Sequence, residues 1–332
     1  MSSIKIYKRI FWIKSKKFKI RCAEFSLLKD KSFKGDILII PGLSEFIERY
    51  EKIAERFVKN NYRVAVLDLP GQGLSSRFGN PKTVIHVSKF NLYISSINLI
   101  INSLSLGKNA PLIFLGNSLG GFLSLYYQII SKNNYDNPCS QPSITIAMAP
   151  MMGLPLSKNL SFIIIFINKI LLLFNSSNIG ISNNLASIAS FLGIAGSNVK
   201  SSVSKASDYW KNEDNINYYG QKVSEDALKA YNKNNNLETT GPSWNWVSCA
   251  IQACNYFFQN IRKTNISTPT LILNAKDETV TDPLAQKKLI RELKNVEEVV
   301  LPSCRHDIIH EKKEVKVLFW SSIEQFLNKH LC

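Results

Sequence analysis

The feature that most constrains this chain is a serine flanked by glycines, which stands between two apolar runs at residues 112–127 (LIFLGNSLGGFLSLYY). The first run has the length of a buried strand, and the second suits a helix. A tight turn between a strand and a helix needs residues with little or no side chain around the serine, and Gly116 and Gly120 meet that need. We therefore expect the Ser118 hydroxyl to project at the end of the strand as a candidate nucleophile. A glycine-rich packing turn is the alternative.

Continuous apolar runs recur in the first half of the chain, and glycine or proline follows each of them closely. Runs that are apolar on both faces are typical of parallel strands covered by helices on both sides. Helical patterns lie between several of these runs, so the order of elements predicts an α/β fold with a mostly parallel central sheet. The expected strands are residues 37–40, 63–67, 112–115 and 144–148, preceded by a strand or hairpin at 17–28, and the helical patterns are 49–60 and 87–104.

The regular alternation lapses after Pro150 and resumes near residue 244. A structureless loop of that length is improbable in a compact domain. We therefore expect residues 1–150 and 241–332 to form the α/β core and residues 151–240 to form a helical cap or lid. The later elements are expected as helices at 244–262, 283–293 and from 314, with strands at 270–273 and 299–301.

The chain has 332 residues and is strongly basic, with 41 Lys and Arg against 25 Asp and Glu, a formal charge of +16. This excess favours an anionic partner such as an acidic membrane surface, or else reflects a biased background composition. The basic residues are scattered and no nucleic-acid motif is present, which argues against a nucleic-acid binder. The six cysteines lack metal-ligand spacing, so we expect reduced thiols, no metal site and no cofactor.

Targeting features are weak. Lysines interrupt the N-terminal region and leave no apolar core for a signal peptide. The longest apolar run, at residues 160–174, is broken by Asn168 and Lys169 and is shorter than the roughly 20 residues that span a bilayer. We expect a cytoplasmic protein with peripheral contact to the inner face of the membrane. The apolar run is interpreted as a lid helix that leans on the bilayer, with an ordinary buried cap helix as the alternative.

A serine hydroxyl needs a base within hydrogen-bond reach and a third group that orients the base. His306 follows the last expected strand, which places it at the same carboxyl edge of the sheet as Ser118. His310 is its rival. His86 precedes a helix on the N-terminal side of the nucleophile and His330 lies near the C-terminus, so both are weaker candidates.

The orienting acid is sought in the loop after the strand at 270–273. Asp277 has the best position there, and Glu278 and Asp282 compete with it. The order serine, acid, histidine is the order of the α/β-hydrolase triad. Oxyanion donors are expected from the backbone amides of Leu119, directly after the nucleophile, and Leu43, in the loop after the strand at 37–40.

Three motifs resemble those of the monoacylglycerol lipase-like group of α/β hydrolases. The segment PGLSEFIERY at residues 41–50 resembles HGxxEHxxRY, and DLPGQGLS at 68–75 is similar to DxxGxGxS. GNSLGG at 116–121 stands where the group has GHSMGG. The Pro-Gly variant, together with GPSWNW at 241–246, is closest to the bacterial inner-membrane lysophospholipases of this superfamily.

The resemblance implies the triad Ser118, Asp277 and His306. It also implies a salt bridge between Glu45 and Arg49 that stiffens the oxyanion loop. The implied activity is hydrolysis of the ester of a single-chain lipid, most of all a lysophospholipid, through an acyl-enzyme. A monoacylglycerol lipase, a broad carboxylesterase and an inactive binding protein on the same fold are the alternatives. The departures from the group pattern, Pro41, Phe46 and Asp307, bear on substrate identity more than on the triad.

Overall fold

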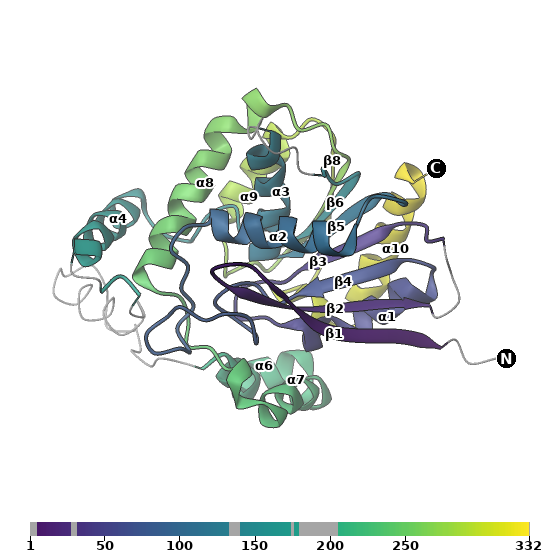
Figure 1. Cartoon of the computed structure of the whole chain (residues 1–332), viewed down its shortest axis with the longest axis horizontal. Coiled ribbons are helices and arrows are strands. Elements are labelled where there is room, and N and C mark those ends of the chain that lie inside the picture. Colours follow the sequence, from purple (N-terminus) through teal and green to yellow (C-terminus); the bar gives the residue numbers. More distant parts are fainter. Residues whose placement is uncertain (1–4, 28–31, 133–139, 174–175, 179–204, 332) are drawn as a thin grey trace.

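The computed structural model describes residues 5–27, 32–132, 140–173, 176–178 and 205–331 (Figure 1). Its centre is an eight-stranded sheet with the order β1-β2-β4-β3-β5-β6-β7-β8. β1 (Ile6–Lys14) and β2 (Lys19–Leu27) form an antiparallel hairpin, and β2 is antiparallel to β4. The other neighbours are parallel. They are β3 (Asp36–Ile40), β4 (Arg63–Leu67), β5 (Leu112–Asn117), β6 (Ile144–Met148), β7 (Thr270–Ala275) and β8 (Val296–Leu301).

Helices cover both faces of the sheet, as the apolar runs predict. Along β3, Leu38 and Ile40 belong to a core shared with α2, α3 and α8, whereas Ile37 and Ile39 belong to a core shared with α1 and α10. All four of these side chains are fully buried, which explains the absence of polar alternation in the strand. The helices are α1 (Glu51–Lys59), α2 (Asn91–Leu104), α3 (Leu119–Lys132), α8 (Trp244–Thr264), α9 (Pro283–Glu292) and α10 (Lys313–His330).

The segment between β6 and α8 is largely helical where the structure describes it. Its elements are α4 (Lys158–Leu173), η2 (Ala206–Lys211), α6 (Glu213–Tyr219), α7 (Gln221–Lys233) and η3 (Asn235–Leu237). In Figure 1, α4 stands at one side of the molecule and α6 and α7 lie below the sheet. Residues 174–175 and 179–204 of the predicted cap lie outside the described residues, so the division into core and cap stays a prediction.

The sequence placed most core elements within a few residues of their observed bounds. The opening hairpin starts earlier, at Ile6, because β1 is a half-exposed edge strand whose basic and apolar residues do not alternate cleanly. β8 is also longer than expected, since it starts at Val296 and carries two glutamates. No described helix is long and apolar enough to cross a membrane. Cys22, Cys249, Cys254 and Cys304 are free thiols, and Cys139 and Cys332 lie outside the described residues.

Candidate active site

The turn between β5 and α3 holds Ser118 in a left-handed conformation, with φ of +50°. Such a backbone is strained for a residue with a side chain, and it is maintained here by close packing. A Cβ on Gly116 would lie 2.2 Å from the Gly120 carbonyl oxygen, and a Cβ on Gly120 would lie 1.8 Å from the carbonyl oxygen of Ile40. The two glycines therefore allow β5, α3 and the end of β3 to approach one another, and the serine projects where they meet.

His306 reaches this serine from the loop after β8. Its Nε2 lies 2.9 Å from the Ser118 Oγ, and its ring is largely buried. The other histidines have different partners: His86 contacts Ser243 at 2.9 Å, His310 contacts Asp307 at 3.0 Å, and His330 lies 3.4 Å from Glu297. The structure therefore brings the predicted nucleophile and base together and sets the three rival histidines apart.

The residue that orients His306 is Glu278 and not Asp277. The Glu278 Oε2 lies 2.7 Å from the His306 Nδ1, and the glutamate side chain is only 2% exposed. Asp277 is exposed, and its amide donates to the Cys304 carbonyl at 2.9 Å. This hydrogen bond ties the loop after β7 to the loop after β8 and turns the next side chain inward. The assignment of Asp277 as the acid is therefore wrong by one residue. Asp282 is the N-cap of α9, where it accepts from Leu284.

The Glu278 carboxylate is held by its surroundings. Its Oε1 accepts from the amides of Val280 and Thr281 at 2.7 and 3.1 Å. Burial alone would raise the pKa of Glu278, but the hydrogen bond and charge of His306 and the two amides together lower it. An ionised carboxylate only accepts hydrogen bonds, so Nδ1 carries the proton and Nε2 is free to accept the proton of Ser118.

The predicted oxyanion donors lie on either side of this serine. Leu119 is the first residue of α3, so its amide has no acceptor within the helix and lies at the positive end of the helix dipole. Leu43 lies in the loop after β3, and the contact between Gly120 and the Ile40 carbonyl brings that loop against the start of α3. The two amides remain the predicted donors.

Glu45 organises the oxyanion loop. Its carboxylate accepts hydrogen bonds from the Gly42 amide, from the Tyr50 hydroxyl and from the Asn117 amide group, the last at 3.1 and 3.2 Å. Arg49 lies 3.4 Å from the same carboxylate, so the predicted salt bridge is present. The contact with Asn117 links the loop directly to the residue before the nucleophile.

Arg49 has a second and closer carboxylate partner that the sequence did not suggest. Its Nη2 lies 2.7 Å from Asp307, the residue after His306. Burial acts to raise the pKa of Asp307, but His310 and Arg49 hold it well below its usual range. Arg49 thus connects the oxyanion loop, through Glu45, to the loop that carries the base.

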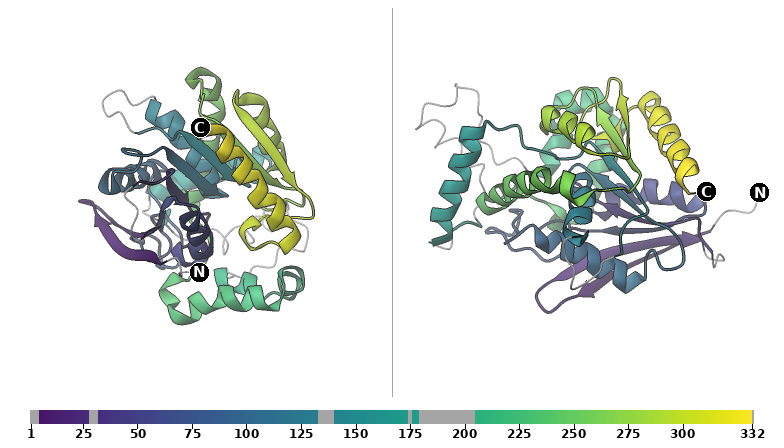
Figure 2. Two further views of the ribbon diagram at one scale, coloured as in Figure 1. Left: turned by 90° about the vertical axis from the view of Figure 1, so that its right-hand side faces the viewer. Right: turned by 90° about the horizontal axis from the view of Figure 1, so that it is seen from above.

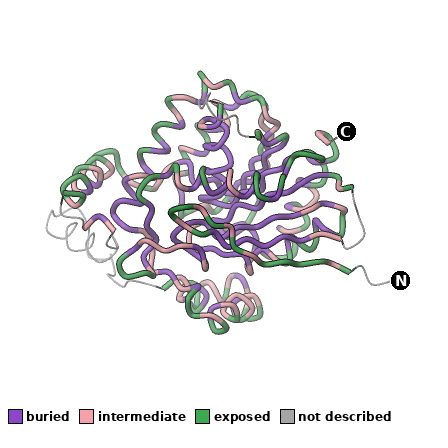
Figure 3. Tube along the Cα trace, in the orientation of Figure 1, coloured by how far each residue is buried: buried purple, intermediate pink, exposed green. Residues whose placement is uncertain are grey.

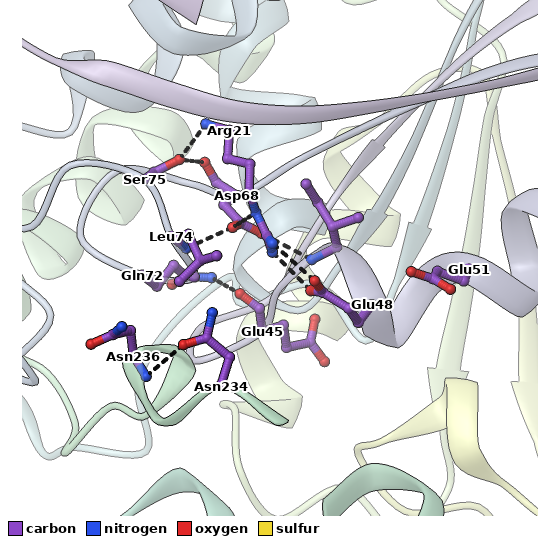
Figure 4. A network of polar contacts seen from close by, with 12 residues as sticks. Arg21, Glu45, Glu48, Glu51, Asp68, Gln72, Leu74, Ser75, Asn234 and Asn236 are labelled. Carbon is purple, nitrogen blue, oxygen red and sulfur yellow. Dashed lines mark hydrogen bonds and ion pairs between the residues drawn. The ribbon is translucent and has the colours of Figure 1, made fainter. Parts of the chain in front are cut away.

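A second polar network supports the oxyanion loop from the side of β2 and β4 (Figure 4). The buried Asp68 accepts from the Arg21 guanidinium at 2.6 Å and from the Ile47 amide at 2.9 Å. Arg21 also forms two hydrogen bonds of 2.8 Å with Glu48. Gln72 donates to the carbonyl oxygens of Gly42 and Glu45, at 2.6 and 2.8 Å. The DxxGxGxS motif therefore acts through structure, by fixing the backbone of the loop that carries Leu43.

The site has the parts that acyl transfer requires. A serine hydroxyl, an imidazole and an ionised carboxylate form one hydrogen-bonded chain, and a helix N-terminus lies beside the nucleophile. Sequence reasoning missed Asn117, Tyr50, Gln72 and Asp307. Asn117, Gln72 and Asp307 contact groups far away in the sequence, and local patterns do not reveal such contacts. Tyr50 donates to Glu45, five residues earlier.

Comparison with known proteins adds to this geometry. The profile of the family described as "Serine aminopeptidase, S33" (Hydrolase_4) matches residues 31–313. The chain is 23% identical over 297 residues to the "Probable lysophospholipase L2" of Haemophilus influenzae, a match that covers 88% of this chain and 83% of that protein. Its structure is similar to a monoglyceride lipase of Saccharomyces cerevisiae, with a TM-score of 0.66, 18% identity and coverage of 98% of this chain and 97% of the lipase. It is also similar to a carboxyl esterase of Bacillus coagulans, with a TM-score of 0.69, 15% identity and coverage of 98% and 99%. At these identities, the two structural likenesses show the fold alone.

Proposed function

This chain belongs to the Hydrolase_4 family, "Serine aminopeptidase, S33", and is an α/β hydrolase of the monoacylglycerol lipase-like group; from this premise we propose that it hydrolyses the carboxylic ester of a lysophospholipid. The observation that carries the chemistry is the continuous chain of hydrogen bonds from Ser118 through His306 to Glu278. The lipid class is supported by the similarity to the probable lysophospholipase L2 of Haemophilus influenzae.

The proposed reaction has two steps. His306 Nε2 takes the proton of Ser118 while Oγ attacks the ester carbonyl carbon, and the amides of Leu43 and Leu119 stabilise the negative charge on the oxygen. The imidazolium then gives its proton to the departing alcohol, which leaves an acyl group on Ser118. In the second step, water attacks this acyl group with His306 as the base, and a fatty acid is released.

The outer side of α4 supports contact with a lipid surface. Ile164 and Asn168 face the body of the protein, and Asn168 donates to Asn245 of α8 at 3.1 Å. On the outer side, Phe162 is 71% exposed and Leu173 is 81% exposed. In Figure 3, the tube of α4, at the left, is coloured mainly as exposed and intermediate. An exposed apolar face on a helix is typical of segments that enter the interface of a bilayer. We propose that α4 rests with this outer side on the inner face of an anionic membrane.

Fatty-acid release from purified protein tests the substrate. Lysophosphatidylethanolamine should be cleaved faster than monoolein or p-nitrophenyl butyrate, and Ser118→Ala should abolish all three activities. Faster cleavage of monoolein would favour a monoacylglycerol lipase. Cleavage of the soluble ester alone would favour a broad carboxylesterase. A folded protein that a fluorophosphonate probe does not label would be an inactive binding protein.

Sedimentation with vesicles tests the membrane contact. Phe166 of α4 is also exposed. Replacing both Phe162 and Phe166 by serine removes two large apolar groups, each worth about 1.5–3 kcal/mol when fully buried. Binding to phosphatidylglycerol vesicles should therefore fall at least about tenfold. The matched control replaces Val317 and Leu318, two exposed apolar residues of α10, by serine. An equal loss in both double variants would show that α4 has no special part in membrane binding.

A further inference from the structure

A cavity lies on the α1 and α10 side of the sheet, and residues of α7 also line it. In the left view of Figure 2, the ribbon of α10 (yellow) runs down toward those of α6 and α7 (green). The volume of the cavity is about 530 Å³, which is within the range of small-molecule sites. Residues of α1, α7, η4 (Ile308–His310) and α10 line it, and Ser118, Glu278 and His306 do not. This cavity is therefore separate from the catalytic serine.

One wall of the cavity is rich in cations. Arg56 pairs with Glu324 at 2.9 Å, and the largely exposed Lys52 lies 3.4 Å from Asp226. Asp226 lies closer to Lys229, at 2.7 Å. Lys316 has no carboxylate within ion-pair distance among the described residues. The wall therefore contains one cation without a partner and one whose partner is shared.

Lys316 and Lys52 lie near enough to repel each other. Burial lowers the pKa of Lys316, and the neighbouring Lys52 ammonium lowers it further, while Asp307 and Glu311 act in the opposite direction. Two ammonium groups that line the same cavity are stabilised when an anion enters between them.

A buried hydrogen-bond donor without an acceptor in the described part of the chain also lies at this cavity. Arg49 lines the cavity, and its side chain is 9% exposed. Its Nη2 serves Glu45 and Asp307, but its Nε finds no acceptor among the described residues. A buried donor without a partner costs free energy, so an acceptor supplied by a ligand is favoured there.

The lining also includes apolar and aromatic side chains next to these cations. They are those of Phe319 and Trp320 of α10 and Ile53 of α1. We propose that this cavity binds an amphiphilic anion, whose carboxylate or phosphate lies among Lys52, Lys316 and Arg49 and whose apolar part lies against Phe319 and Trp320. Such a ligand bridges α10 and α1 and meets the guanidinium that joins the oxyanion loop to Asp307. Its binding is thus coupled to the loops that carry Leu43 and His306.

The two sources of this chemistry are a fatty acid and a phosphate head group. Calorimetric titration of the Ser118→Ala protein with octanoate, octyl phosphate and inorganic phosphate distinguishes them, and it reads binding without hydrolysis. We expect saturable binding of at least one octyl anion. Lys316→Ala should weaken that binding tenfold or more, and Lys316→Arg should restore most of it. Lys313→Ala is the matched control, because Lys313 is exposed on the same helix and does not line the cavity.

The outcomes separate this site from the catalytic one. An octyl anion that binds in the acyl part of the catalytic site would be insensitive to Lys316, so unchanged affinity in Lys316→Ala and Lys52→Ala would overturn the proposal. Absence of binding by all three probes would do the same. Equal affinity for inorganic and octyl phosphate would contradict the proposed contact of the ligand's apolar part with Phe319 and Trp320. If the Lys316 variants fail to fold, the affinity of Lys52→Ala for the octyl anions provides the same test. None of these results depends on whether the protein cleaves a lysophospholipid.

Discussion

Replacing Glu278 by glutamine tests whether this residue is the acid of the triad, because it exchanges only one carboxylate oxygen for an NH₂ group. The side-chain oxygen and nitrogen of glutamine occupy nearly the same positions as the two carboxylate oxygens. One of these positions receives the amides of Val280 and Thr281, so it must hold an oxygen. The side-chain NH₂ group then faces His306 Nδ1, which becomes the acceptor. The ring proton moves to Nε2, and the imidazole can no longer accept the proton of Ser118.

The size of the effect follows from these contacts. Turning the amide over would set its NH₂ group against two backbone donors, at a cost of about 1–3 kcal/mol for each donor left unsatisfied. The inactive tautomer is therefore favoured by about 2–6 kcal/mol. The corresponding aspartate-to-asparagine change in chymotrypsin-like proteases lowers kcat about 10⁴-fold, which is about 5.5 kcal/mol at 1.36 kcal/mol per decade. We expect Glu278→Gln to lower kcat about 10³–10⁴-fold.

Hydrolysis of p-nitrophenyl butyrate measures kcat directly, and the labelling rate with a fluorophosphonate reports the reactivity of Ser118 without turnover. The matched control is Asp277→Asn, one residue away and exposed, which should retain kcat within about twofold, since surface substitutions rarely matter. Circular dichroism checks that both variants are folded. A large loss in Asp277→Asn with near-normal activity in Glu278→Gln would refute the assignment of the acid.

Three further predictions concern the surroundings of the site. Asn117→Ala removes the link to Glu45, so kcat should fall about tenfold or more with little change in the melting temperature, as measured by ester hydrolysis and thermal unfolding. Because the folded pKa of Glu278 is lowered, its ionisation contributes stability that is complete above about pH 5 and lost as pH falls through the folded pKa. Urea unfolding should therefore show that the stability difference between wild type and Glu278→Gln changes as pH falls below the usual range of a glutamate, and a difference that is independent of pH would contradict this. Arg21→Met leaves Asp68 buried without its cation and should lower the free energy of unfolding by about 3–5 kcal/mol, whereas a loss below about 1 kcal/mol would show that the amides suffice.

The sheet could be predicted from the sequence because its central strands are runs of consecutive apolar residues. In β3 and β5, every residue from Ile37 to Ile40 and from Leu112 to Leu115 is apolar, and no other environment suits such runs. The turn at Ser118 was equally readable, since Gly116 and Gly120 are required by contacts that any side chain would prevent. Local sequence patterns were sufficient to predict the features whose geometry depends on neighbouring residues.

The acid could not be predicted in the same way. Asp277 and Glu278 are adjacent carboxylates in an irregular loop, where side-chain direction follows no period. The choice depends on the hydrogen bond between the Asp277 amide and the Cys304 carbonyl, which joins two loops distant in the sequence. The partnership of Arg49 with Asp307 was hidden for the same reason. Long-range contacts decided both cases.

The pairing of β6 with β7 determines when Ser118 becomes reactive during translation of the chain. These neighbouring strands are separated in the sequence by the whole segment that contains α4, α6, α7 and α8. A nascent chain on the ribosome can therefore form the first six strands and the Ser118 turn before β7 and β8 have been made. Ser118 then has neither Glu278 nor His306. The serine becomes a nucleophile only when the segment that carries Glu278 and His306 has been translated and has docked, so covalent labelling of Ser118 reports completion of the fold.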